Sequence, residues 1–106
     1  MKRPIILAAA LAAAAVAGPS AAQGMPESMT KAACTACHAV DKKMLGPAYQ
    51  DVAKKYRGDA TAQDKLVQKV RKGGAGVWGP VPMPPHGPDK ISDEELAKAI
   101  AWVLAR

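Results

Sequence analysis

The stretch Cys34-Thr35-Ala36-Cys37-His38 is the most informative part of this chain of 106 residues for its fold and its cofactor. Two thiols one helical turn apart can each add to a vinyl group of the same haem, and the imidazole that follows can then face the iron. The stretch also contains both cysteines of the chain. We therefore expect one haem c, attached covalently through Cys34 and Cys37, with His38 as the first axial ligand of its iron.

Three other interpretations of the cysteine pair remain open. A structural disulfide suits an exported protein, but it would leave His38 without a task. A thioredoxin-like redox pair would need a strand before the motif and a βαβ setting, and the sequence predicts neither. A zinc site would need a third and a fourth ligand at suitable spacing, and only His86 offers itself.

The second face of a haem iron either binds a sixth ligand or stays open for catalysis or gas binding. A methionine thioether raises the reduction potential and suits an electron carrier. Met83 lies forty-five residues after His38, in the string Val81-Pro82-Met83-Pro84-Pro85, where the prolines restrict the backbone. We expect Met83 to be the sixth ligand. Three other methionines lie close to the cysteine motif and are expected to fill the core: Met25, Met29 and Met44.

The first residues follow the pattern of a secretory leader. A short basic start precedes an apolar run over residues 5–17, and small residues then lead to Ala22. This order is typical of a cleavable signal peptide, so we expect residues 1–22 to be removed and residues 23–106 to form one periplasmic domain. An uncleaved membrane anchor is the alternative, but the apolar run is short and Pro19 breaks it. No later segment is apolar enough to insert stably into a membrane.

The remaining sequence predicts an all-α domain, because apolar residues recur at helical spacing and no useful length shows strand alternation. We expect four short helices, over about residues 26–36, 49–56, 61–72 and 92–104. Thr61 with Asp64, and Ser92 with Glu95, resemble capping boxes at the starts of the last two helices. The buried face of the last helix is expected to comprise Leu96, Ala99, Ile100 and Val103.

Between the last two helices, residues 73–88 contain five prolines and five glycines in sixteen positions. This composition predicts a stiff, irregular loop. Four short helices and such a loop cannot close a core by themselves, and large aromatic side chains are few, since the chain has no Phe, two Trp and two Tyr. We expect the helices to wrap around the haem.

Four segments together resemble the class I cytochromes c, and most closely the small bacterial cytochrome c-551 group, also called cytochrome c8. The segments cover nearly all of the chain after the leader, and they are residues 34–38 (CTACH), 44–52 (MLGPAYQDV), 76–85 (GVWGPVPMPP) and 101–104 (AWVL). The resemblance implies the class I fold, with four short helices around one covalently bound haem. It also implies an electron-transfer protein rather than an enzyme.

The resemblance further implies roles for three residues near the haem. The Pro47 carbonyl accepts a hydrogen bond from the proximal histidine, here His38. The Trp78 indole N–H reaches a haem propionate, with simple packing as the alternative, and Lys69 stands where relatives often have an Arg near a propionate. Four differences from the family pattern are Met29 and Tyr56 at Phe positions, His86 at an Asn position, and a slightly longer stretch over residues 87–91. We expect His86 to be a solvent-exposed loop histidine.

The charge pattern suggests how the protein meets its partners. The formal net charge is +6, and residues 42–72 hold nine Lys or Arg against three Asp. These bases can steer the protein toward an acidic redox partner if they ring the haem edge, or they can form an ordinary solvated surface. The resemblance implies a bc-type complex as donor and a nitrite reductase, oxidase or peroxidase as acceptor. We expect a monomer that binds no nucleic acid, and the rival function is a haem enzyme or gas-binding cytochrome with a labile sixth ligand.

Overall fold

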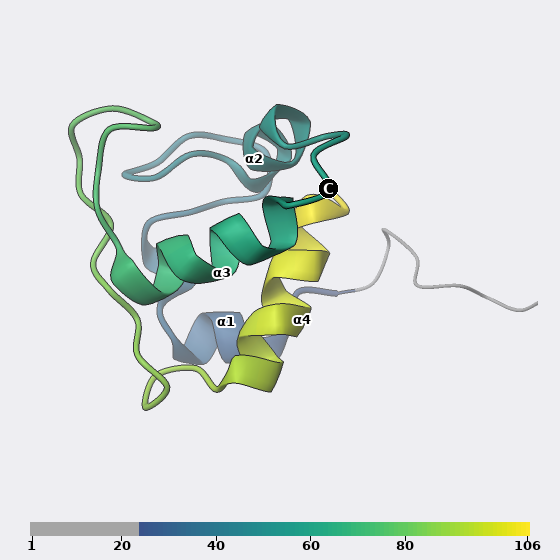
Figure 1. Ribbon diagram of the computed structural model, residues 1–106. Coiled ribbons are helices and arrows are strands. Elements are labelled where there is room, and N and C mark those ends of the chain that lie inside the picture. The colour runs from purple at the N-terminus through teal and green to yellow at the C-terminus, as the bar shows by residue number, and fades with distance from the viewer. Residues whose placement is uncertain (1–23) are drawn as a thin grey trace, which may run out of the picture.

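The computed structural model describes residues 24–106, and the expected leader in residues 1–22 lies outside them. Within the described range the chain forms four α-helices and one short 3-10 helix: α1 Glu27–Lys31, η1 Cys34–Ala36, α2 Tyr49–Lys55, α3 Ala62–Lys72 and α4 Asp93–Leu104. The only pairing of extended backbone in these residues is an isolated antiparallel bridge between Gly74 and Met83. The prediction of an all-α domain is therefore confirmed (Figure 1).

The C-terminal helix α4 holds the other helices together. It contacts α1, α2 and α3, and Figure 1 shows it crossing one end of α3 and passing α1. Its start has the expected capping box: Glu95 N donates to Ser92 Oγ and Ser92 N donates to Glu95 Oε1, both at 3.1 Å. The capping hydrogen bond lowers the pKa of the Glu95 carboxyl. No helix within residues 24–106 is long and apolar enough to cross a membrane.

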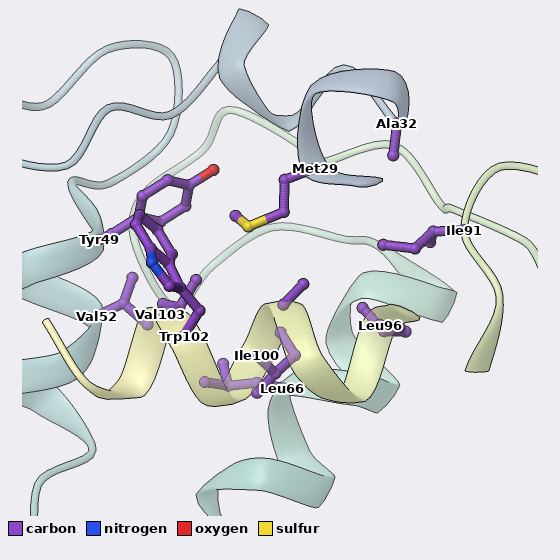
Figure 2. Close-up of a cluster of buried hydrophobic side chains, with 11 residues drawn as sticks. Met29, Ala32, Tyr49, Val52, Leu66, Ile91, Leu96, Ile100, Trp102 and Val103 are labelled. Carbon is purple, nitrogen blue, oxygen red and sulfur yellow. The ribbon is translucent and has the colours of Figure 1, made fainter. Parts of the chain in front are cut away.

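The buried cluster lies mainly along the inner face of α4. Its members are Met29, Ala32, Tyr49, Val52, Leu66, Ile91, Leu96, Ala99, Ile100, Trp102 and Val103. In Figure 2 the two aromatic rings, Tyr49 and Trp102, lie together at one end of the cluster, and Ile91 and Leu96 lie at the other. The expected buried face of α4 is confirmed, and Trp102 joins it.

The first expected helix, over residues 26–36, is divided into two pieces. The α-helix ends at Lys31, and Ala33 adopts the left-handed conformation with φ of 62° before η1 begins. A non-glycine residue in this region costs about 1–2 kcal/mol, so tertiary packing must support it. The cysteine motif consequently lies on its own turn rather than on the end of a continuous helix.

Two further local expectations are wrong. Thr61 does not cap α3 with its side chain, because its hydroxyl donates to Asp59 Oδ1 at 2.7 Å and its backbone N–H donates to the same atom at 2.8 Å. Met44 does not fill the core, because it is 42% exposed in the loop before α2. Met29 is buried and Met25 packs against the cluster, as expected.

Removing the cap of α4 should destabilise the whole fold. We expect Ser92→Ala to lower the free energy of unfolding by about 1 kcal/mol, measured by chemical denaturation of the holoprotein. The matched control is Thr61→Ala, whose hydroxyl lies at the start of α3 without capping it and whose replacement should cost less than half as much. Equal losses for the two variants would contradict this account of the two helix starts.

Candidate functional site

A cavity of about 370 Å³ lies between α2, α3, α4 and the loop that follows α3. Its size is in the usual range for pockets that bind small molecules and cofactors. All residues assigned a site role from the sequence line this one cavity: Cys34, Cys37, His38, Pro47, Lys69, Trp78 and Met83. The fold thus brings together residues that are up to forty-nine positions apart in the chain.

The imidazole of His38 is held in one orientation. Its Nδ1 lies 2.8 Å from the carbonyl oxygen of Pro47. Because a carbonyl only accepts, Nδ1 must carry the hydrogen, and Nε2 is then the nitrogen with a lone pair for a metal. A hydrogen bond of this kind fixes the ring and raises its basicity as a ligand.

Packing holds the same ring from two further directions. A Cβ on Gly46 would meet the His38 ring at Cε1, with Nδ1 at 2.7 Å, so only glycine leaves room for the imidazole. The Tyr49 ring stacks on His38 with centroids 5.3 Å apart and planes at 23°. Trp102 of α4 meets Tyr49 edge-on at 5.6 Å, which connects the imidazole to the buried cluster.

The two cysteine side chains line the cavity, are partly buried and form no disulfide with each other. Burial raises the pKa of the Cys34 thiol. Thiol–disulfide oxidoreductases depend on a cysteine whose pKa is lowered, so this environment disfavours the thioredoxin-like interpretation. Among residues 24–106, no three His, Cys, Asp or Glu side chains form a group that could hold a metal, so this part of the chain offers no zinc site.

Met83 lies on the loop between α3 and α4, and its backbone is tied to the end of α3. Gly74 N donates to Met83 O and Met83 N donates to Gly74 O, both at 2.9 Å. The neighbouring Gly73 has φ of 67°, and a Cβ there would meet the Met83 carbonyl and Pro85 N. Gly73 is therefore needed for the Met83 backbone to approach the end of α3 so closely, and Gly74, with φ of 116°, needs glycine for its own backbone conformation.

The rim of the cavity carries apolar and basic side chains together. Trp78 is 40% exposed, and Lys55 Nζ lies 5.7 Å from the centroid of its ring. Lys69 projects from α3 beside Gly74. Both Trp78 and Lys69 line the cavity, and their contact with haem propionates stays a prediction.

His86 is not the exposed loop histidine expected from the sequence, because it is only 7% exposed. Its backbone N–H donates to Val70 O at 2.9 Å, and its Nδ1 lies 2.8 Å from Pro84 O. These bonds draw the residue against the last turn of α3, where it lines the cavity with Met83. The composition of the loop gave no sign of this, since the Val70 carbonyl lies on another element.

Three residues that shape the site were not identified from the sequence: Gly46 and Tyr49, which line the cavity beside His38, and Arg71, which lies outside its lining. The Arg71 guanidinium bonds to the carbonyls of His86 and Ile91 and to Asp93. Gly46 could have been suspected from its place before Pro47, where a turn was expected. Nothing in the local pattern distinguishes Arg71 from the other basic residues of α3, because its partners are fifteen or more positions away.

Comparison with known proteins gives a consistent family assignment. The family model described as "Cytochrome C oxidase, cbb3-type, subunit III" matches residues 19–103. Cytochrome c-551 of Pseudomonas aeruginosa is 51% identical over 73 residues, which are 69% of this chain and 67% of that protein. Cytochrome c-551 of Stutzerimonas stutzeri is 40% identical over 105 residues, which are 99% of this chain and 98% of the relative.

A solved structure agrees with this assignment. The crystal structure of wild-type cytochrome c552 from Nitrosomonas europaea superposes with a TM-score of 0.67 at 38% identity, and it covers 74% of this chain and 94% of that one. The chain therefore belongs to the class I cytochromes c, within the family whose model it matches. It is a small electron-transfer protein with one haem rather than an enzyme.

The cofactor of this family is one haem c, attached here through Cys34 and Cys37. The described residues fit such a group. The cavity is lined mainly by apolar side chains and by both thiols, and the buried Tyr49 hydroxyl that lines it has no hydrogen-bond partner in this part of the chain. Burial raises the pKa of the Tyr49 phenol, which stays neutral.

Filling the space beside His38 should disturb the imidazole. We expect Gly46→Ala to cost about 1–3 kcal/mol of stability, because the new methyl group overpacks the ring and pushes it off the Pro47 carbonyl. Thermal unfolding of the holoprotein measures the loss, and the spectrum of the haem reports the altered ligand. Gly24→Ala is the control, since a Cβ at Gly24 meets nothing within 4 Å. A Gly46→Ala protein with unchanged stability and spectrum would contradict the tight packing.

Proposed function

We propose that this protein is a single-electron carrier of the bacterial periplasm, whose haem iron is bound by His38 Nε2 and by the Met83 thioether. The observation that supports this proposal most directly is the single cavity lined by both residues and both cysteines. His38 is already oriented with Nε2 as its metal-binding nitrogen. Met83 is held at the backbone by two hydrogen bonds, which lowers the entropy cost of keeping its flexible side chain in place.

The haem supplies the redox chemistry, since its iron accepts and returns one electron. The chain has to keep the ligands in place in both oxidation states and to exclude water from the iron. Tyr49 and the α4 cluster support His38 from behind. The prolines restrict the backbone around Met83, and Gly73 leaves the space for it to lie against the end of α3. Small movement between the two states favours fast electron exchange.

The exposed apolar residues at the rim of the cavity favour docking to another protein. Leu45, Val77, Trp78 and Val81 are all at least 40% exposed, and all four line the cavity. Lys55 lies over Trp78 beside them. Apolar contact at the rim with positive charge nearby suits a brief complex with a protein of acidic surface.

We further propose the redox partners of the protein and its export to the periplasm. A bc-type complex is the donor that we propose, and a nitrite reductase, an oxidase or a peroxidase is the acceptor. Residues 1–22 would act as a signal peptide and leave residues 23–106 as the carrier domain, a monomer that binds no nucleic acid. N-terminal sequencing of the periplasmic protein tests the cleavage after Ala22.

Replacing the proposed thioether ligand should convert the carrier into a gas-binding protein. We expect Met83→Ala to bind carbon monoxide in the reduced state, to lose the weak far-red absorption band of the oxidised protein, and to lower the reduction potential. The drop should be on the order of 0.1 V, within the range of about 0.8 V that axial ligands span. Met44→Ala is the control, because Met44 is exposed on a loop.

Wild-type protein that binds carbon monoxide readily without denaturant would overturn the proposed ligation. That result would instead favour the haem enzyme or gas-binding cytochrome with an open sixth position. A Met83→Ala protein that keeps the far-red band would show that another residue supplies the sulfur.

The docking proposal predicts that removing a positive charge beside the exposed rim slows electron transfer, and that salt weakens this effect. We expect Lys55→Gln to slow second-order electron transfer to an acidic partner several-fold at low ionic strength, and the difference should vanish as salt screens the charges. Lys98→Gln on α4 is the control, since Lys98 is exposed and pairs with Glu94, whereas Lys55 lies over Trp78 at the rim. Stopped-flow measurement with a purified reductase from the same periplasm provides the rates. Equal slowing by both substitutions would point to net charge rather than docking at the rim.

A further inference from the structure

Arg71, in the last turn of α3, connects three parts of the chain through one guanidinium. Its Nη1 donates to Ile91 O at 2.7 Å and to His86 O at 3.2 Å, and its Nη2 bonds to Asp93 Oδ1 at 2.5 Å. The Arg71 side chain is 15% exposed, whereas that of Asp93 is 91% exposed. The two carbonyl contacts therefore lie in a less hydrated setting than the ion pair, and we expect them to contribute more.

The carbonyls that Arg71 binds belong to the chain just downstream of Met83. His86 follows Met83 by three residues, and its backbone N–H is bonded to Val70 O, next to Arg71 on α3. Ile91 packs in the core at the end of the same segment, directly before the cap of α4. The loop carrying Met83 is thus tied to α3 at two places, upstream by the Gly74–Met83 bridge and downstream by the contacts of residues 86–91.

The planar fork of arginine suits this position. One guanidinium can bond two carbonyls and a carboxylate at once, with fixed geometry and without losing its charge. His86 and Ile91 are both buried, so removing the guanidinium deprives two poorly hydrated carbonyls of a charged donor. Each lost hydrogen bond should raise the equilibrium constant for local opening of the segment roughly tenfold.

We propose that Arg71 is a positioning residue for Met83, holding the downstream half of its loop against α3 so that the thioether stays on the cavity. The role rests on the proposed ligation by Met83. Arg71 makes no contact with the candidate ligand itself and acts through the backbone of residues 86–91. Its function is to keep the sixth ligand from leaving the iron.

The test compares three variants of the full-length holoprotein. Arg71→Met keeps much of the side-chain length but removes all donors, Arg71→Lys keeps the charge but not the fork, and Arg57→Met removes an exposed arginine of the turn after α2. The first readout is the far-red band of the oxidised protein as temperature rises. The second is amide hydrogen exchange at Met83 and His86, whose N–H groups are both bonded, with Leu96 of α4 as the internal reference.

We expect Arg71→Met to lose the far-red band well before the helices unfold and to speed exchange at Met83 and His86 by about tenfold to a hundredfold relative to Leu96. Arg71→Lys should lie between this variant and the wild type, and Arg57→Met should match the wild type. If Arg71→Met yields no holoprotein, the Arg71→Lys comparison decides in the same way.

The outcomes separate this inference from the proposed function. A wild type without the far-red band would refute ligation by Met83. The positioning role alone would be refuted if the wild type shows the band and the Arg71 variants keep it until the helices unfold. In that case the ratio of the amide exchange rates of Met83 and Leu96 would also be the same in the variants as in the wild type.

Discussion

The orientation of the His38 imidazole is the constraint on which the rest of the site depends. The Pro47 carbonyl determines which nitrogen carries the hydrogen, Gly46 leaves the space for the ring, and Tyr49 covers one of its faces. Each of these contacts comes from residues 46–49, where the chain enters α2. The geometry of this side of the cavity is therefore determined by the short loop after the cysteine motif and the start of α2, without contacts from distant elements.

The buried cluster extends that constraint to the whole domain. Tyr49 contacts Trp102, and Trp102 belongs to α4, the helix that contacts all three other α-helices. Displacement of His38 would therefore disturb the packing along α4. Both large aromatic members of the cluster lie at this end (Figure 2). A chain without Phe has few large rings to place, and two of them, Tyr49 and Trp102, lie behind the proximal histidine. The rest of the interior is aliphatic and borders the cavity, which explains why a domain of this size needs its cofactor to complete the core.

Local signals predicted those parts of the structure that depend on near neighbours in the chain. The Ser92–Glu95 cap and the buried stripe on α4 each lie within a few turns, and both appear as expected. The Cys34–His38 motif lines the cavity, although it lies on a separate turn and not on the end of the expected helix. The left-handed Ala33 did not follow from the sequence, because alanine gives no sign of such a turn. The burial of His86 and the contacts of Arg71 were equally hidden. His86 N–H bonds to Val70 O, and Arg71 bonds to the carbonyls of His86 and Ile91, each fifteen or more positions away.

The two candidate ligands of the iron therefore differ in how much of the fold each one needs. His38 is held by contacts no more than eleven positions along the chain, and the covalent cysteines lie beside it. Met83 is held by the two hydrogen bonds of its bridge to Gly74, by the bond of His86 to α3 and by the Arg71 guanidinium. The loop that carries it, between α3 and α4, forms no helix and only this isolated bridge. Segments with few regular hydrogen bonds open at lower free energy than packed helices. Partial opening of this protein should consequently release the methionine side of the cavity while the histidine side stays formed.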